Sequence, residues 1–231
     1  MNNAAQNIIK LEEETPMMQQ YITIKKEHPD SILFFRMGDF YEMFNEDAKI
    51  ASRVLEIALT SRNKNKANPT PMCGIPHHAS KSYIAKLIKS GKKVAICEQT
   101  EDPKFTKGLV RREVVRVVTP GTILDDNLLD PKQNHFLISL HSNAKGWGFA
   151  ALDITTGLFK VTEFDGDNRD SLLQDELEKF DPKEIILSEI LVDEFNKPRW
   201  LEDRESSLQL CEDSTFSYKD SYRLLIEHFK T

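Results

Sequence analysis

The chain has 231 residues, 39% of them hydrophobic and 29% charged, which is typical of a globular protein with one large domain or two ordinary ones. No apolar run approaches the roughly 18 residues of a membrane span, the N-terminus lacks the pattern of a signal peptide, and three cysteines without a Cys-x-x-Cys pair indicate a reduced, intracellular protein. The net charge of −6 hides an asymmetry, because residues 1–124 carry 19 Lys and Arg against 14 Asp and Glu, whereas residues 125–231 carry 12 against 23. The asymmetry favours a first half that faces a polyanion, and a merely solvated basic surface is an equally good interpretation.

The start of the chain predicts a helix, a buried strand and a second helix. Thr15-Pro16 is an N-cap followed by proline at the first helical position, so a helix should begin there and end before Pro29. The apolar run 32–37 suits a buried strand, which Gly38-Asp39 should end. A second helix is predicted from Asn45, because small and apolar residues recur at spacings of three and four: Ala48, Ala51, Val54, Leu55 and Ala58.

The rest of the first half completes an α+β domain with a mixed sheet. Residues 62–71 read as a polar, basic loop and residues 72–76 as a turn. A third helix should follow and stop at Gly91. Two strands, 94–97 and 114–118, are separated by a second basic loop over residues 104–112.

The second half predicts an α/β domain, with a boundary near residue 128 that gives domains 1–127 and 128–231. Composition changes around Pro120-Gly121 and at Asp130-Pro131. Three strands should come first, and helices and strands should then alternate; the predicted ranges are strands 135–140, 147–153 and 158–164, helix 171–180, strand 184–187, helix 190–195 and strand 207–211. This is the element order of an RNase H-like fold, which the end of the chain could truncate.

An RNase H-like order raises the hypothesis of a metal-dependent nuclease. Such enzymes need several carboxylates that converge on two cations, and Asp153 lies where the first could be. The other acids of this region cluster within one helix, so an aspartate that orders a turn is the favoured interpretation of Asp153. His77-His78 lack metal-ligand partners at a familiar spacing, and the chain has neither a nucleotide-binding P-loop nor a Gly-x-Ser-x-Gly elbow.

The tripeptide Phe40-Tyr41-Glu42 follows the predicted turn. In an extended segment Phe40 and Glu42 share one side, and Tyr41 faces the other. A phenylalanine beside a carboxylate is a poor pair for a core, because a buried charge needs a partner. The same pair on a surface would suit a wedge with a polar contact, so the ring of Phe40 is predicted to be exposed.

Several blocks of the first half resemble the N-terminal part of the MutS family, which recognises mismatched DNA. The blocks occur in order: TPMMQQY at 15–21, FFRMGDFYEMF at 34–44, PMCGIPHHA at 71–79, VAICEQ at 94–99 and VVRVVTPGT at 114–122. The second half is similar, through GWGFAALDITTGLF, to the connector domain of that family, which has an RNase H-like fold without nuclease activity. The resemblance implies that the chain is a mismatch-binding domain followed by a connector, and is itself no enzyme.

The resemblance also implies roles for particular residues. The Phe of the family's Phe-x-Glu motif enters the minor groove and stacks on a mispaired base, and the Glu hydrogen-bonds that base; these positions are Phe40 and Glu42. Arg62 matches a position that contacts DNA, and Met37 and Met72 match positions near the wedge. The candidates for phosphate contacts rest on charge alone: Lys64, Lys66, Lys104, Lys107, Arg111 and Arg112.

The expected partners follow from the same resemblance. They are mismatched duplex DNA and, on the acidic connector, a MutL-like matchmaker. Members of the family continue with core, clamp and P-loop ATPase domains, so ATP and Mg²⁺ would act in a longer parent protein, and no cofactor is expected here. The parent would form a homodimer through those further domains and work in the bacterial cytoplasm at the nucleoid, whereas residues 1–231 alone should be monomeric. A nuclease that uses the second half remains the alternative function.

Overall fold

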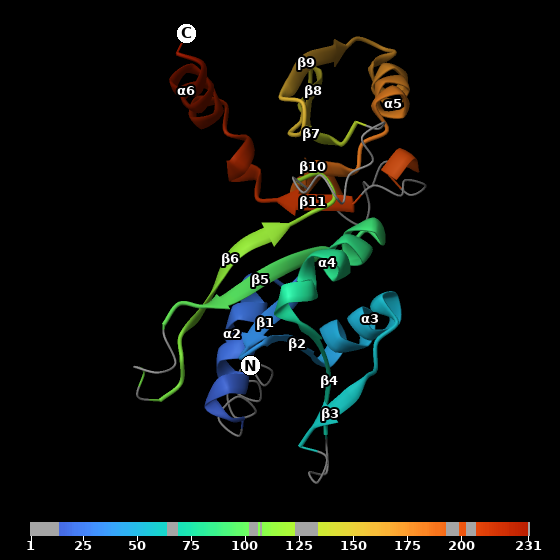
Figure 1. The fold of residues 1–231 in the computed structure, drawn as a ribbon. Helices are drawn as coiled ribbons and strands as arrows, with labels where there is room; N and C mark the ends of the chain where they lie inside the picture. Colours follow the sequence, from blue (N-terminus) through green and yellow to red (C-terminus); the bar gives the residue numbers. More distant parts are fainter. Residues whose placement is uncertain are drawn as a thin grey trace, which may run out of the picture. The chain divides into compact units, whose positions relative to one another are not determined.

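The structure is a computed structural model, which describes residues 14–63, 69–101, 106, 108–122, 134–192, 199–201 and 207–230. It consists of two compact units, Met1–Thr119 and Pro120–Thr231, called here the N-terminal and C-terminal units (Figure 1). The predicted boundary near residue 128 falls within residues 123–133, outside the described residues, and stays a prediction. No helix among the described residues is long and apolar enough to span a membrane.

The N-terminal unit is built on a six-stranded mixed sheet in the order β3-β4-β2-β1-β5-β6. Only the central pair β1 and β5 is parallel; the other neighbours are antiparallel. The strands are β1 (Ser31–Met37), β2 (Phe40–Phe44), β3 (Thr60–Arg62), β4 (Thr70–Pro76), β5 (Lys93–Gln99) and β6 (Arg112–Val118). The predicted α+β class with a mixed sheet is confirmed.

Helices cover both faces of this sheet. They are α2 (Pro16–Glu27), α3 (Asn45–Leu55) and α4 (Ser80–Lys89), with a 3-10 turn, η1 (His77–Ala79), before α4. The start of α2 is as predicted, because Thr15 Oγ1 accepts a hydrogen bond from the Met18 N–H at 3.4 Å. The helix α2 lays Met18 and Tyr21 over Phe35 and Phe44, which are fully buried.

The opposite face of the sheet packs against α3. Cys73 on β4 pairs with Met43 on β2, and its thiol lies 3.5 Å from the Ala48 carbonyl of α3. Because neighbouring residues of a strand point to opposite faces, Met43 lies on the α3 face and Glu42 and Phe44 on the α2 face. One face of β2 therefore packs against α3, and the other, which includes Glu42, lies on the side of α2.

The predictions of a loop over 62–71 and a turn over 72–76 are wrong at the residues that form strands, since Arg62 ends β3 and β4 begins at Thr70. Residues 72–76 form most of strand β4 and not a turn. Proline and glycine at positions 71, 74 and 76 suggest a turn by composition, but β4 has β2 on one side and β3 on the other, and both ladders hold it extended. Long-range pairing here overrides local preference.

The C-terminal unit has a five-stranded sheet in the order β11-β10-β7-β8-β9. The first three strands along the chain are antiparallel, and β10 and β11 then add in parallel to β7. The strands are β7 (Phe136–Ser142), β8 (Gly146–Asp153), β9 (Leu158–Asp165), β10 (Glu184–Ser188) and β11 (Ser207–Cys211). This order and these directions confirm the predicted RNase H-like arrangement.

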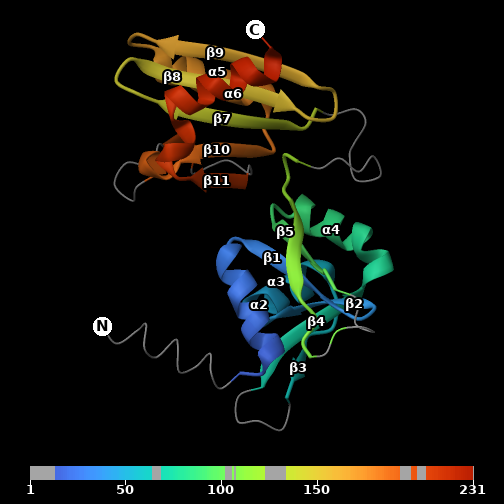
Figure 2. The ribbon, with the colours of Figure 1, turned by 90° about the vertical axis from the view of Figure 1, so that its left-hand side faces the viewer.

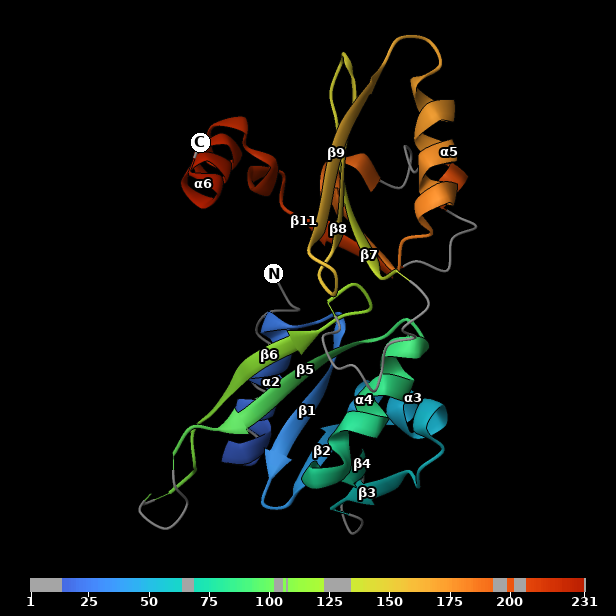
Figure 3. The ribbon, with the colours of Figure 1, turned by 45° about the horizontal axis from the view of Figure 1, so that its top comes forward.

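The helices of the C-terminal unit lie on both sides of its sheet. The helix α5 (Arg169–Phe180) packs Leu173 and Leu177 against Ile138, Leu140 and Phe149. A second helix, α6 (Tyr218–Phe229), which the sequence analysis did not predict, lies on the opposite side (Figures 2 and 3). The helix predicted at 190–195 is a 3-10 turn over its described residues; the short turns are η2 (Glu189–Val192), η3 (Arg199–Leu201) and η4 (Asp213–Phe216).

Candidate nucleic-acid interface

The β1–β2 hairpin presents Phe40 at its tip. Gly38 and Asp39 form a two-residue turn between the paired residues Met37 and Phe40, and the φ of Gly38, +57°, is one that glycine adopts without steric strain. The Phe40 side chain is 47% exposed, whereas Tyr41 is buried. The prediction of an exposed Phe40 ring is thus confirmed.

Glu42 lies on the same face as Phe40, one pleat nearer the core. Its carboxylate faces Arg62 of β3, with 3.6 Å between Glu42 Oε2 and Arg62 Nη1, too long for a hydrogen bond. Within the described part of the chain, Glu42 Oε2 is buried and accepts no hydrogen bond. A carboxylate oxygen in this state can still bind a donor or take a proton.

The surroundings of Glu42 change its affinity for protons. Burial raises the pKa of the Glu42 carboxyl, and the positive charges of Arg62 and Arg112 oppose this rise without cancelling it. The proton-bound form of Glu42 is therefore more accessible than for a carboxyl in water. A protonated carboxyl is a hydrogen-bond donor, which an ionised one is not.

Gly74 of β4 lies against both Phe40 and Glu42. It pairs with Glu42 across the ladder, and a Cβ built on it would stand 3.7 Å from Glu42 Cγ and 3.8 Å from Phe40 Cδ1. Such a Cβ fits, but a longer side chain would extend into the surface between the ring and the carboxyl. The exposed glycine places no side chain on the sheet surface between the ring and the carboxyl.

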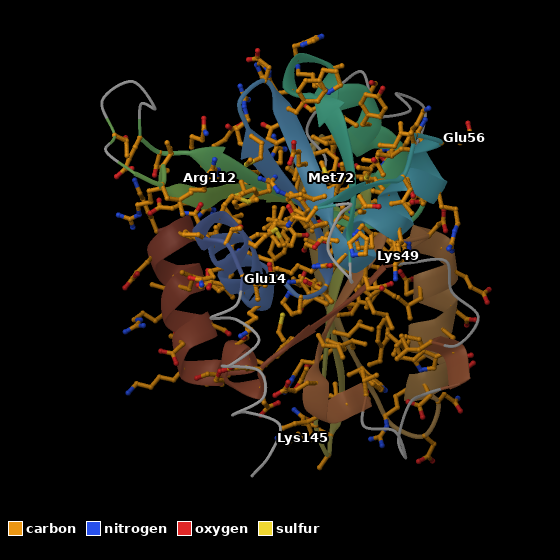
Figure 4. The ribbon with its side chains drawn as sticks, turned by 90° about the horizontal axis from the view of Figure 1, so that it is seen from below. Glu14, Lys49, Glu56, Met72, Arg112 and Lys145 are labelled. Atoms are coloured by element: carbon orange, nitrogen blue, oxygen red, sulfur yellow. The ribbon has the colours of Figure 1, made fainter. Side chains whose placement is uncertain are left out.

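Arg112 is buried, although the sequence predicted a contact between this residue and a DNA phosphate. It is only 7% exposed and lies beside α2 (Figure 4). Its Nε donates to the Arg36 carbonyl at 2.7 Å and its Nη1 to Gln20 Oε1 at 3.0 Å, and its guanidinium stacks over the Phe35 ring at 4.8 Å. These contacts hold the Arg112 side chain inside the unit, so the structure does not support a phosphate contact by Arg112. The positive charge of its guanidinium lowers the pKa of Glu42.

The remaining predicted residues divide into three groups. Met37 and Met72 are half-buried at the edge of the core under α2, and Met37 Sδ accepts from Arg112 Nη2 at 3.5 Å. Arg111 is exposed and pairs with Glu113 at 2.5 Å, which leaves its guanidinium accessible to solvent. Four predicted residues lie outside the described residues: Lys64, Lys66, Lys104 and Lys107.

A cluster behind the hairpin was not predicted. The Tyr41 hydroxyl donates to Glu98 Oε1, and Arg36 lies over the Tyr41 ring at 5.5 Å and 3.7 Å from Glu98 Oε2. Burial and the neighbouring Glu98 carboxylate raise the pKa of Tyr41 to about 12. The His77 N–H also donates to the Asp39 carbonyl at 2.9 Å. These contacts tie the hairpin to β5 and to the start of η1. In the sequence, only the alternation that turns Tyr41 away from Phe40 hints at them.

Asp153 of the C-terminal unit orders a turn. Its Oδ1 accepts from the Thr155 N–H at 2.9 Å and from the Thr155 hydroxyl at 2.6 Å. Burial would raise the pKa of Asp153, but the hydrogen bonds from Thr155 outweigh it and lower the pKa. No three His, Cys, Asp or Glu side chains gather as a metal site in the part of the chain that the structure describes. The nuclease alternative therefore has no support from the geometry.

The two folded units correspond to a known pair of domains. The family model described as MutS domain I matches residues 15–127, and the one described as MutS domain II matches residues 135–231. Together the two matches extend over most of the chain. The chain belongs to the MutS family.

Many curated proteins resemble the chain. A protein from Desulforamulus reducens is 55% identical over 175 residues, which cover 75% of this chain and 20% of that protein. Proteins from Ruminiclostridium cellulolyticum and Halothermothrix orenii are 46% and 48% identical, cover 94% of this chain, and are themselves covered over 25% and 24% of their length. All three are named DNA mismatch repair protein MutS. The chain thus spans about a fifth to a quarter of the length of these relatives.

Proposed function

We propose that the chain is a non-catalytic part of a DNA mismatch repair protein, which recognises mispaired or unpaired bases by inserting Phe40 into the minor groove. The observation that carries the proposal is the exposed ring of Phe40 beside the Glu42 carboxylate, whose Oε2 accepts no hydrogen bond from the described residues. The names of the relatives supply the process in which such a site would serve. The C-terminal unit would be the connector.

The energetics favour a mismatch over a paired site. An apolar wedge that unstacks a base step requires a few kcal/mol and kinks the duplex. A mismatch has already lost part of its stacking and pairing, so the deformation requires less there. Stacking of a base on the Phe40 ring would return roughly 1–3 kcal/mol. The site would therefore read the deformability of the duplex and not its sequence.

Glu42 would add a polar contact to the displaced base. An ionised carboxylate near phosphates is repelled and cannot donate to a base nitrogen. Burial already raises the pKa of Glu42, and the negative field of DNA would raise it further. On binding, the carboxyl would take up a proton and donate it in a hydrogen bond to the base.

The rest of the interface would supply affinity. Arg62 and Arg111 have exposed surface for phosphates, and the basic residues outside the described ranges would add to them. Residues 1–231 alone should bind DNA weakly, as a monomer and with poor discrimination, because clamps and a second subunit would hold the duplex in the longer parent.

That parent would carry the ATP- and Mg²⁺-dependent activity, form the homodimer, and act at the nucleoid of the bacterial cytoplasm. A MutL-like matchmaker would dock on the acidic connector.

Insertion of the ring can be tested on the 231-residue chain itself. The probe is a low-salt titration of a duplex that carries 2-aminopurine next to an unpaired thymine, since its fluorescence responds to a change in stacking. We expect a change with the wild type, none with Phe40→Ala, and a normal response with Phe159→Ala. Phe159 is a matched control, because it is 43% exposed on the C-terminal unit. An undiminished response of Phe40→Ala would contradict the proposal.

A second experiment tests the nuclease alternative. The chain is incubated with duplex DNA and an RNA–DNA hybrid in Mg²⁺ or Mn²⁺. We expect no cleavage, because the described residues offer no cluster of acids for two cations. Cleavage that Asp153→Asn abolishes would restore the nuclease hypothesis.

A further inference from the structure

The Glu42–Arg62 pair has the geometry of a contact that can be exchanged. The two charged groups are 3.6 Å apart, and their side chains are 21% and 34% exposed. Within the described residues no hydrogen bond joins them or fixes the Arg62 guanidinium elsewhere. Attraction between the charges holds the pair together, and a stronger anion could draw the arginine away without breaking a hydrogen bond.

The other groups packed around Glu42 differ from Arg62 in mobility or in charge. Its ladder neighbours, Phe35 of β1 and Gly74 of β4, are uncharged. Arg112 of β6 also acts on Glu42, but its guanidinium is fixed in the interior by Arg36, Gln20 and other contacts. Of the two arginines that act on the Glu42 carboxylate, only Arg62 is both partly exposed and free to turn towards solvent.

We propose that Arg62 is a positioning residue, which pairs with Glu42 while the protein is free and transfers to a DNA phosphate when the protein binds. The inference rests on the proposed role of Glu42 as a group that contacts the base. In the free protein the positive charge of Arg62 lowers the pKa of Glu42 and so favours its ionised form. A phosphate of the bound duplex competes for the guanidinium, and the carboxyl, now beside phosphates and without its cation, takes one proton from solvent.

The exchange gives DNA binding a dependence on Arg62 that a simple phosphate contact would not have. A group that loses a nearby cation on binding has a higher pKa in the complex than in the free protein, so the affinity falls as the pH rises from the free to the bound pKa. Without Arg62 the pKa of Glu42 in the free protein is already higher. The fall in DNA affinity then starts at a higher pH and is smaller. If Arg62 made only a simple phosphate contact, its loss would lower the affinity by the same factor at every pH.

The first test needs no DNA. Carbon-13 NMR of the side-chain carboxyls follows Glu42 in the free 231-residue chain as the pH changes, and the spectrum of Glu42→Gln assigns its signal. We expect Arg62→Gln to raise the pKa of Glu42, Arg62→Lys to keep it near the wild-type value, and Arg111→Gln to leave it unchanged. Arg111 is the matched control, because it pairs with Glu113 on the exposed surface. An unchanged Glu42 pKa in Arg62→Gln would overturn the inference, whatever Phe40 does.

The second test follows the proton in the complex. Calorimetry of the longer parent with mismatched DNA, in two buffers of different ionisation enthalpy, counts the protons taken up on binding. We expect uptake by the wild type and a smaller uptake by Arg62→Gln. Equal uptake by both proteins would show that Arg62 does not exchange partners. A higher Glu42 pKa in free Arg62→Gln, together with a parent that does not distinguish mismatches, would contradict the proposed function and leave the pairing in the free protein intact.

Discussion

Two places along and just after strand β2 in the N-terminal unit each bring together a phenylalanine and a carboxylate, in opposite states. Under α2, Phe44 is fully buried against the Tyr21 ring, with 4.9 Å between the ring centroids. Beyond the end of that cover, Phe40 on the same strand and the same face is 47% exposed. The two residues are four positions apart, so strand geometry gives both side chains the same direction. The helix α2 covers Phe44 and does not cover Phe40. This cover, and not the residue type, buries one ring and leaves the other exposed.

The carboxylates differ in the same way. Asp47 accepts hydrogen bonds at Oδ2 from the Leu33 N–H at 3.0 Å and the Tyr21 hydroxyl at 3.2 Å, and its Oδ1 lies 2.9 Å from Lys25 Nζ. Glu42 has a loose ion pair and, within the described residues, no hydrogen bond to its buried oxygen. A carboxylate whose oxygens are bonded locally serves the fold, whereas one with a buried, unpartnered oxygen beside an exposed ring is available to a ligand.

The largest expected effect on the free energy of unfolding comes from Phe44, the ring that α2 covers. Truncation of Phe44 to alanine leaves a cavity between β2 and α2, and the loss of a buried phenylalanine destabilises by about 3–5 kcal/mol. Urea unfolding of the 231-residue chain, followed by the signal of the N-terminal unit, measures the change. A loss below about 1 kcal/mol would mean that α2 does not pack on Phe44 as described.

Asp47, the buried carboxylate, should have the next largest effect on the free energy of unfolding. Asp47→Asn removes the charge that faces Lys25 and turns an amide NH₂ towards groups that are themselves donors. Leaving such buried donors unsatisfied destabilises by about 1–3 kcal/mol. The same urea experiment checks this value, and a neutral substitution would show that the hydrogen bonds to Asp47 contribute little.

Glu42→Gln should change stability little and should alter its pH dependence. The pKa of Glu42 is raised in the folded protein, so this carboxyl contributes stability below its ordinary pKa of about 4.3, and the contribution is lost as the pH rises through the folded pKa. Glutamine does not titrate. We therefore expect the free energy of unfolding of Glu42→Gln to increase relative to wild type between pH 4 and pH 7. A relative decrease over this range would mean that the folded protein favours ionised Glu42.

The smallest expected effect on stability is that of the exposed ring. Phe40→Ala removes surface that is already half in water, and such substitutions usually change stability by no more than about 0.5 kcal/mol. Thermal unfolding beside Phe44→Ala gives the direct comparison. A Phe40→Ala chain destabilised by several kcal/mol would place this ring in the core and remove the contrast between the two regions.

Much of this arrangement could be predicted from the sequence, because it depends on local patterns. The N-cap at Thr15, the glycine turn at Gly38 and the alternation of Phe40, Tyr41 and Glu42 are all short-range signals. They were sufficient for the start of α2, for the end of β1 at Gly38 and for the exposure of Phe40. The five strands and the helix α5 of the second unit were predictable from their characteristic order, whereas α6 was not predicted.

The parts that could not be predicted depend on residues far apart in the chain. Strand β4 has the composition of a turn and is extended only because β2 and β3 pair with it. Arg112 belongs to a basic stretch, and its burial depends on Gln20 and Arg36, which come more than 70 positions earlier. The pairing of Arg62 with Glu42 likewise joins two strands that are separated by β4 in the sheet. Sequence patterns show which residues are charged or apolar, but not which of them meet.

The central claim is that the exposed ring of Phe40 gives preference for mismatched DNA. The most direct measurement compares the affinity of the longer parent for a matched duplex and for the same duplex with one G·T mismatch or one unpaired thymine, at one salt concentration. We predict that Phe40→Ala binds both duplexes equally, since the stacking that offsets the kink is lost, while Phe159→Ala keeps the wild-type preference. A folded Phe40→Ala protein that still prefers the mismatch as strongly as wild type would contradict the claim.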